Sequence, residues 1–138
     1  MTAKEYLSQA RALEREIEAK REHITRIRST LARCTPHLTG MPGSGQGVDF
    51  TETAARIMDL TKETEEDIRR MIELKRAIGH TIDALEDPLE RALLSYRYLS
   101  GLSWQQVALR LYCDRSTVWR IHKNALRKVR VPEKEIQS

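Results

Sequence analysis

The sequence predicts an all-α protein: a long antiparallel helical hairpin, paired as a coiled coil, followed by a C-terminal helical module. Two long segments, 2–33 and 50–86, repeat apolar residues at steps of three and four, the spacing of one helix face. Glycines and prolines separate them, and a third pattern, over 102–130, indicates two short helices joined by a tight turn. We therefore expect a hairpin over residues 1–87 and a separate module over residues 88–131.

The first helix is expected to begin at a capping box, Thr2 with Glu5, and to continue for about 30 residues, roughly 45 Å. Its apolar seam follows a heptad pattern that one charged residue, Lys20, interrupts. The seam positions are Tyr6, Ala10, Leu13, Ile17, Lys20, Ile24, Ile27 and Leu31. Because most helix stability comes from packing an apolar face, this helix needs a partner along its seam.

Residues 34–48 are expected to form a flexible linker that ends the first helix, because Pro36 and the glycines after it do not favour a helix. The same glycines are also compatible with a phosphate-binding loop. We disfavour that interpretation, because no predicted strand precedes the glycines and no Gly-Lys-Ser/Thr ends them.

The second long helix is expected to begin at Asp49 or Thr51. Its seam is Ala54, Ile57, Thr64, Ile68, Met71, Ile78, Ile82 and Leu85, broadened by Met58, Leu60, Ile72 and Leu74. A stripe this wide favours more than one neighbouring helix, so we expect two hairpins to pair into a four-helix bundle and form a homodimer. The alternative is a monomeric hairpin folded back on the C-terminal module.

The C-terminal module is expected to begin at Asp87, which can cap a helix that starts with Pro88. The apolar face of this supporting helix is Leu89, Ala92, Leu93, Tyr96 and Leu99. Ser103 with Gln106 then forms a capping box, and Asp114 is a natural cap for the last helix. The apolar positions of these two helices are Val107, Ala108, Leu111, Val118, Ile121, Ala125 and Val129. This is the sequence form of a helix-turn-helix, whose second helix lies in the major groove of DNA.

The last helix is expected to run over 115–130 and to end at Pro132, with 132–138 as a frayed tail. At 100° per residue, its cationic side lies opposite Ile121. That side carries Ser116, Arg120, Lys123 and Arg127, flanked by Trp119 and Arg130. A basic outer face on a helix that buries its other face is what a phosphate-lined groove requires. The alternative is an ordinary solvated charged face.

Charge is distributed unevenly along the chain. Residues 88–138 hold 10 Lys/Arg against 4 Asp/Glu, whereas residues 1–87 hold 14 against 16. The positive charge therefore belongs to the module with the turn motif. The N-terminus lacks the apolar run of a signal peptide, and we expect neither a membrane span nor a membrane partner, but a protein of the bacterial cytoplasm with reduced cysteines.

Residues 103–130 resemble the DNA-reading half of region 4 of the sigma-70 family. The stretches that carry the resemblance are Asp114-Arg115-Ser116-Thr117-Val118, Ile121 and Ala125-Leu126-Arg127-Lys128. More loosely, the whole chain resembles small phage and prophage regulators of the RinA/ArpU kind. Two departures stand out: Tyr112 lies where helix-turn-helix sequences prefer glycine, and Trp119 lies where sigma-like helices carry a polar or basic residue.

The resemblance implies that Arg115, Ser116 and Arg120 read base edges. Arginine can grip guanine through two hydrogen bonds, and serine can donate or accept in the groove. The other expected contacts are phosphates or neighbouring bases for Thr117, Lys123, Asn124 and Arg127, and phosphates for Ser103, Trp104 and Gln105. Trp104 is alternatively a core anchor, which we favour. Trp119 is expected to pack on a thymine methyl or, as the resemblance implies, on another protein.

We expect a sequence-specific regulator of transcription, phage-encoded, that binds double-stranded DNA. Contact with RNA polymerase or another transcription factor is implied by the resemblance alone. We expect no enzyme, metal or cofactor, because His23, His37, His80 and His122 lack partners at metal-ligand spacing and no catalytic set assembles. The alternatives are a phage small terminase subunit, in which the DNA module usually comes first, and a helical interaction protein that never meets DNA.

Overall fold

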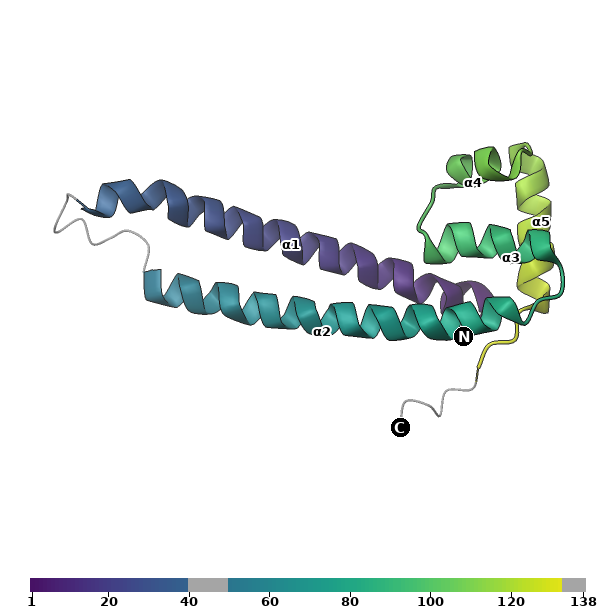
Figure 1. Cartoon of the computed structure of the whole chain (residues 1–138), viewed down its shortest axis with the longest axis horizontal. Coiled ribbons are helices and arrows are strands. Elements are labelled where there is room, and N and C mark those ends of the chain that lie inside the picture. Colours follow the sequence, from purple (N-terminus) through teal and green to yellow (C-terminus); the bar gives the residue numbers. More distant parts are fainter. Residues whose placement is uncertain (40–49, 133–138) are drawn as a thin grey trace. The chain divides into compact units, whose positions relative to one another are not determined.

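The computed structural model describes residues 1–39 and 50–132, and this part of the chain is all-helical (Figure 1). The elements are α1 (Ala3–Thr39), α2 (Phe50–Asp83), α3 (Pro88–Leu94), a π-helical turn η1 (Ser95–Leu99), α4 (Trp104–Leu111) and α5 (Arg115–Lys128). The expected all-α class is therefore confirmed. No helix within the described ranges is long and apolar enough to cross a bilayer.

The described chain forms two compact units. Residues 1–13 and 71–132 form one of them, here called the terminal unit, which holds the first turns of α1, the end of α2 and all the later helices. The other, here called the two-helix unit, holds the described residues of 14–70, from α1 and α2 alone.

The long helices begin as expected but end differently. Thr2 and Glu5 form the predicted capping box, with the Glu5 carboxylate 2.9 Å from the backbone nitrogen of Thr2. The prediction that a linker begins at residue 34 is wrong, because α1 continues to Thr39. A proline removes one backbone hydrogen bond, but its fixed φ is itself helical, so Pro36 does not end the helix. The remainder of the expected linker, from residue 40, lies outside the described residues, as does Asp49.

In the two-helix unit, α1 and α2 lie side by side with opposite chain directions (Figure 1). The predicted α1 seam is buried at Ile17 and Ile24. Lys20, which interrupts it, places Nζ 2.6 Å from Oδ2 of Asp67, a residue only 6% exposed. This hydrogen bond raises the pKa of the Lys20 ammonium above its ordinary value. The interruption is therefore a polar contact between the two helices.

The predicted α2 seam is correct in its middle and wrong at its start. Thr64 is buried, but Ala54 of the predicted seam is exposed, and so are Met58 and Ile72 among the residues expected to broaden it. The Thr64 hydroxyl donates a hydrogen bond to the backbone carbonyl of Leu60, as threonine in a helix commonly does. Helix α2 ends at Asp83, so the expected boundary at residue 86 is late by one short turn.

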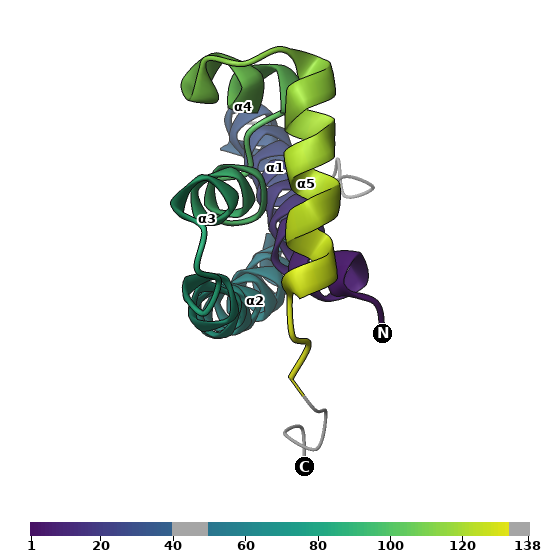
Figure 2. The same cartoon turned by 90° about the vertical axis from the view of Figure 1, so that its right-hand side faces the viewer.

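The core of the terminal unit collects apolar side chains from every helix in it. Its members are Tyr6, Leu7, Ala10, Ile78, Ile82, Leu85, Leu93, Leu94, Tyr98, Val107, Ala108, Val118, Ile121 and Ala125. Figure 2 shows α5 running across the ends of α3 and α4. Val118, Ile121 and Ala125 of α5 are buried in this core. The first turns of α1 are thus part of the same core as the C-terminal helices.

Helix α3 begins as predicted. The Asp87 carboxylate accepts a hydrogen bond from the backbone N–H of Leu89, and Pro88 occupies the first turn. Its expected apolar face is partly wrong, because Leu89 is exposed and Leu94 and Tyr98 are buried. The π turn η1 accounts for Tyr98, because a π turn holds more residues than an α turn and the 100° rule therefore fails after Leu94.

Helices α4 and α5 carry the predicted caps, at Ser103 and at Asp114. Between them Tyr112 adopts the left-handed conformation, with φ 57° and ψ 40°, at the position where glycine was expected. Helix α5 ends at Lys128, two residues before the predicted end. Val129 is extended there, and it packs with Val131 against the core because residues two apart on an extended chain share a face.

Candidate nucleic-acid interface

The exposed side of α5 is the candidate site, and local sequence fixes how this helix starts. The Asp114 carboxylate accepts a 2.8 Å hydrogen bond from the backbone of Thr117, and a 3.4 Å contact joins it to the Ser116 hydroxyl. Hydrogen bonds from Thr117, above all, hold the pKa of this carboxyl below its ordinary value. The first turn of α5 is therefore held by a charged cap.

The buried side of α5 fixes which way the other side points. Val118, Ile121, His122 and Ala125 are buried. Of the predicted contact residues, Ser103, Gln105, Arg115, Ser116, Trp119, Arg120, Lys123 and Arg127 are exposed, and Thr117 and Asn124 are partly buried. Six of the exposed residues of α5 lie on one side of the helix, here called the outer face: Arg115, Ser116, Trp119, Arg120, Lys123 and Arg127.

Some residues of the outer face contact a neighbouring side chain, and others do not. The Lys123 ammonium lies 5.4 Å from the centre of the Trp119 ring, which is 60% exposed, and Arg127 donates a 2.9 Å hydrogen bond to Asn124. Arg115 and Arg120 form no hydrogen bond or ion pair with other described residues. At the start of α4, Ser103 accepts from Gln106, so its side chain also serves as a cap.

A cavity of about 350 Å³ lies where the first turn of α5 meets α4 and the first turn of α1. It is lined by Lys4, Trp104, Arg115, Ser116, Val118, Trp119 and His122. Sequence reasoning missed Lys4, because its neighbours in this cavity lie about a hundred positions away and no local pattern connects them. None of the described lining residues is acidic, so the cavity is cationic at its rim.

Beneath this cavity is a layer of polar aromatic contacts. The Trp104 ring meets His122 edge-on at 4.6 Å between centroids, and the Arg97 guanidinium lies 4.3 Å from the centre of Trp104. Burial, followed by the charges of Lys4 and Arg97, lowers the pKa of His122 to about 4. His122 is therefore a neutral packing residue at neutral pH, and Trp104 is half-buried against the core.

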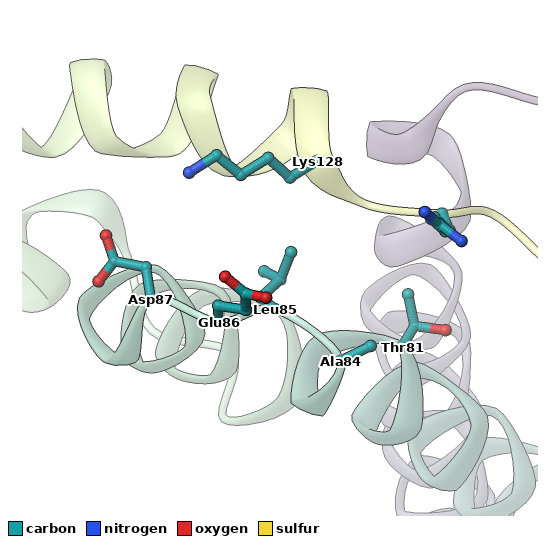
Figure 3. A pocket seen from close by; sticks show the side chains of 7 residues that line it. Thr81, Ala84, Leu85, Glu86, Asp87 and Lys128 are labelled. Atoms are coloured by element: carbon teal, nitrogen blue, oxygen red, sulfur yellow. The ribbon is translucent and has the colours of Figure 1, made fainter.

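The opposite end of α5 is held by an ion pair. Lys128 Nζ lies 3.0 Å from a carboxylate oxygen of Glu90, a buried residue of α3. A cavity of about 640 Å³ adjoins it, between α5 and the chain that connects α2 to α3 (Figure 3). Lys128 extends along one side of this cavity, and Glu86 and Asp87 lie on the other. This cavity carries both signs of charge, unlike the one at the start of α5.

Taken together, the terminal unit is an all-helical assembly that presents one cationic helix face. The chain belongs to the family described as "Protein of unknown function (DUF722)", which matches residues 8–131. No curated protein and no solved structure significantly matches the chain.

Proposed function

We propose that this protein binds double-stranded DNA through the outer face of α5 and regulates transcription by recognising a particular sequence. The observation that carries the proposal is the two-sidedness of α5. Its apolar side packs into the core, while three arginines and a lysine project outward on consecutive turns. An α-helix fits the major groove of B-form DNA, and cations on its outer side attract the phosphates that border that groove.

The contacts within the outer face favour a division of roles. Arg115 and Arg120, together with Ser116, are the proposed base-reading residues. Lys123 and Arg127 follow one and two turns later and are proposed to hold phosphates, with Thr117 and Asn124 beside them. Ser103 and Gln105, at the start of α4, are proposed to meet phosphate from the other side.

The finer fold is proposed on the same basis. Helices α4 and α5, their caps and the tight turn at Tyr112 support a helix-turn-helix of the sigma region 4 type, with α3 and η1 behind it. We likewise propose that α1 and α2 form an antiparallel coiled-coil hairpin and that the chain acts as a homodimer through it. The exposed apolar side chains of Met58 and Ile72, left over after the seam is filled, support a further partner for α2.

The resemblance to RinA/ArpU-like phage regulators supports the proposed place of action, transcription in an infected bacterial cell. RNA polymerase is a proposed partner, and Trp119 is the proposed point of contact because it is a large exposed aromatic residue between cations. Retention on the protein of polymerase from a bacterial lysate at low salt would support this contact, and no retention would contradict it.

The experiment that tests the function is selection of bound fragments from a random pool of duplex DNA, followed by affinity measurements across a range of salt concentrations. We expect an enriched motif and affinity that falls steeply as salt rises. Two half-sites at a fixed spacing would report the symmetry of a dimer. A protein that binds no duplex, or binds with no salt dependence, would contradict the proposal and favour a helical interaction protein. A ring-sized oligomer in light scattering would favour a terminase-like role.

A further inference from the structure

The first turn of α1 borders the start of α5, in the cavity that Lys4 shares with Arg115, Ser116 and the two tryptophans. We propose that this cavity is a binding site for one backbone phosphate of the bound duplex, with Lys4 as the residue that contacts the phosphate and the charge of the base-reading Arg115 adding attraction from the same rim. The N-terminal turn would then be part of the DNA interface. This inference rests on the proposed function and adds to the interface a residue from outside the helix-turn-helix, Lys4.

The position of Lys4 is fixed by the core, not by a loose arm. Tyr6 and Leu7 lie two and three positions after Lys4. They are 8% and 0% exposed, in the same buried cluster as Val118 and Ile121 of α5. The capping box of Thr2 and Glu5 holds the turn in which Lys4 lies. A phosphate at this point would therefore meet a preorganised cation, which reduces the entropy cost of binding it.

The charges around the cavity favour an anion. Neither Lys4 nor Arg115 forms an ion pair among the described residues. The carboxylates of Glu5 and Asp114, which cap the same two helix ends, do not line the cavity. His122 is neutral, since burial and the Lys4 charge lower its pKa to about 4. An entering phosphate thus meets two cations.

The walls strengthen that attraction. Trp104, Trp119 and Val118 supply apolar surface around the two cations. Apolar walls lower the local dielectric, so a cation and an anion attract each other more strongly than in open water. The cavity between Glu86, Asp87 and Lys128 offers no comparable site, because carboxylates line it.

Intrinsic tryptophan fluorescence can report binding at this cavity, because the two tryptophans of the chain, Trp104 and Trp119, both line it. We expect the intrinsic tryptophan fluorescence to change on titration with duplex DNA. In K4A, affinity for cognate and random duplexes alike should fall about five- to tenfold at 0.1 M salt, and the salt slope should fall by about 0.9, the value of one phosphate contact. Unchanged thermal melting by circular dichroism would establish that K4A is folded.

The matched control is K62A, which removes an exposed lysine of α2 in the two-helix unit and should change neither affinity nor salt slope. If K4A behaves like K62A while R120A still weakens binding, the phosphate site is wrong and the proposed function stands. If the unaltered protein binds no duplex DNA, the proposed function is wrong and the site falls with it.

Discussion

The hydroxyl of Tyr98 lies 2.8 Å from Nε2 of His122, and this hydrogen bond joins η1 to α5 inside the terminal unit. Both residues are almost inaccessible, with 2% and 4% of their surface exposed. Burial raises the pKa of the Tyr98 hydroxyl, against the opposing charges of Arg97 and Arg11. The orientation of the outer face of α5 therefore depends on a buried polar contact that must remain uncharged.

This contact predicts a dependence of stability on pH. His122 has a pKa of about 4 in the folded protein against 6.5 ordinarily, so between these values the unfolded chain binds more protons. Stability should be complete above about pH 6.5 and fall as pH drops towards 4. A tenfold change in proton affinity corresponds to about 1.4 kcal/mol, so the total loss is about 3 kcal/mol. Urea unfolding at pH 7, 5.5 and 4.5 measures it.

The control for that experiment is another histidine. H122Q should remove most of the pH dependence in this window, while H80Q, at an exposed position of α2, should keep it. Equal slopes for the two variants would show that His122 is not the titrating group.

The Tyr98 hydroxyl can be removed alone. Y98F leaves Nε2 of His122 without its partner in a buried site, which costs about 1–3 kcal/mol of unfolding free energy. Y96F is the comparison, because Tyr96 lies in the same turn but is only partly buried, and its ring faces Arg110. The two free energies should differ clearly in urea titrations. A cost for Y98F no larger than that for Y96F would mean that the hydrogen bond contributes little.

The outer face predicts two distinguishable effects on DNA binding. R120A should cost about 1–3 kcal/mol on the selected sequence and relax base preference at one position. K123A should weaken binding to all sequences alike and lower the salt slope by about one. Fluorescence-anisotropy titrations with cognate and scrambled duplexes compare them. Identical behaviour of the two variants would contradict the roles assigned to these residues.

Tyr112 shows what sequence could and could not reveal. A glycine-like turn was expected at this position, and the left-handed backbone is found there although the residue is tyrosine. The caps at Thr2, Asp87, Ser103 and Asp114 were predicted correctly, because a cap is decided within four residues. Such local features account for most of the helix starts.

The features that sequence missed are non-local or depend on backbone detail. Lys4 reaches α5 only because the core brings together residues a hundred positions apart. Tyr98 lies off the predicted apolar face because η1 changes the number of residues per turn. Pro36 predicts the end of the first helix, but α1 continues to Thr39, because the fixed φ of proline is helical and only one backbone hydrogen bond is lost. None of these outcomes is encoded in a short window.

The conformation of Tyr112 predicts a substitution that stabilises the protein. Its side chain is 95% exposed, so its removal loses almost no packing, whereas its φ of 57° strains any residue with a Cβ. Y112G should raise the unfolding free energy by about 0.5–1 kcal/mol after the entropy cost of glycine. Y112A keeps the Cβ and should match the unaltered protein. A destabilised Y112G would show that the ring makes a contact that the backbone strain conceals.

The polar contact between Lys20 and Asp67 in the two-helix unit predicts that an apolar pair can replace it without loss of stability. Asp67 holds Lys20 at 2.6 Å and Arg70 at 3.0 Å, so K20M leaves a nearly buried carboxylate with only the exposed arginine and should lower the urea midpoint. K20M/D67L places apolar residues on both sides and should restore or exceed the original midpoint, because desolvating an ion pair offsets much of its attraction. R70A removes only the exposed partner and should change little. If the double variant is no more stable than K20M, the ion pair stabilises the unit more than an apolar pair in its place would, which contradicts this prediction.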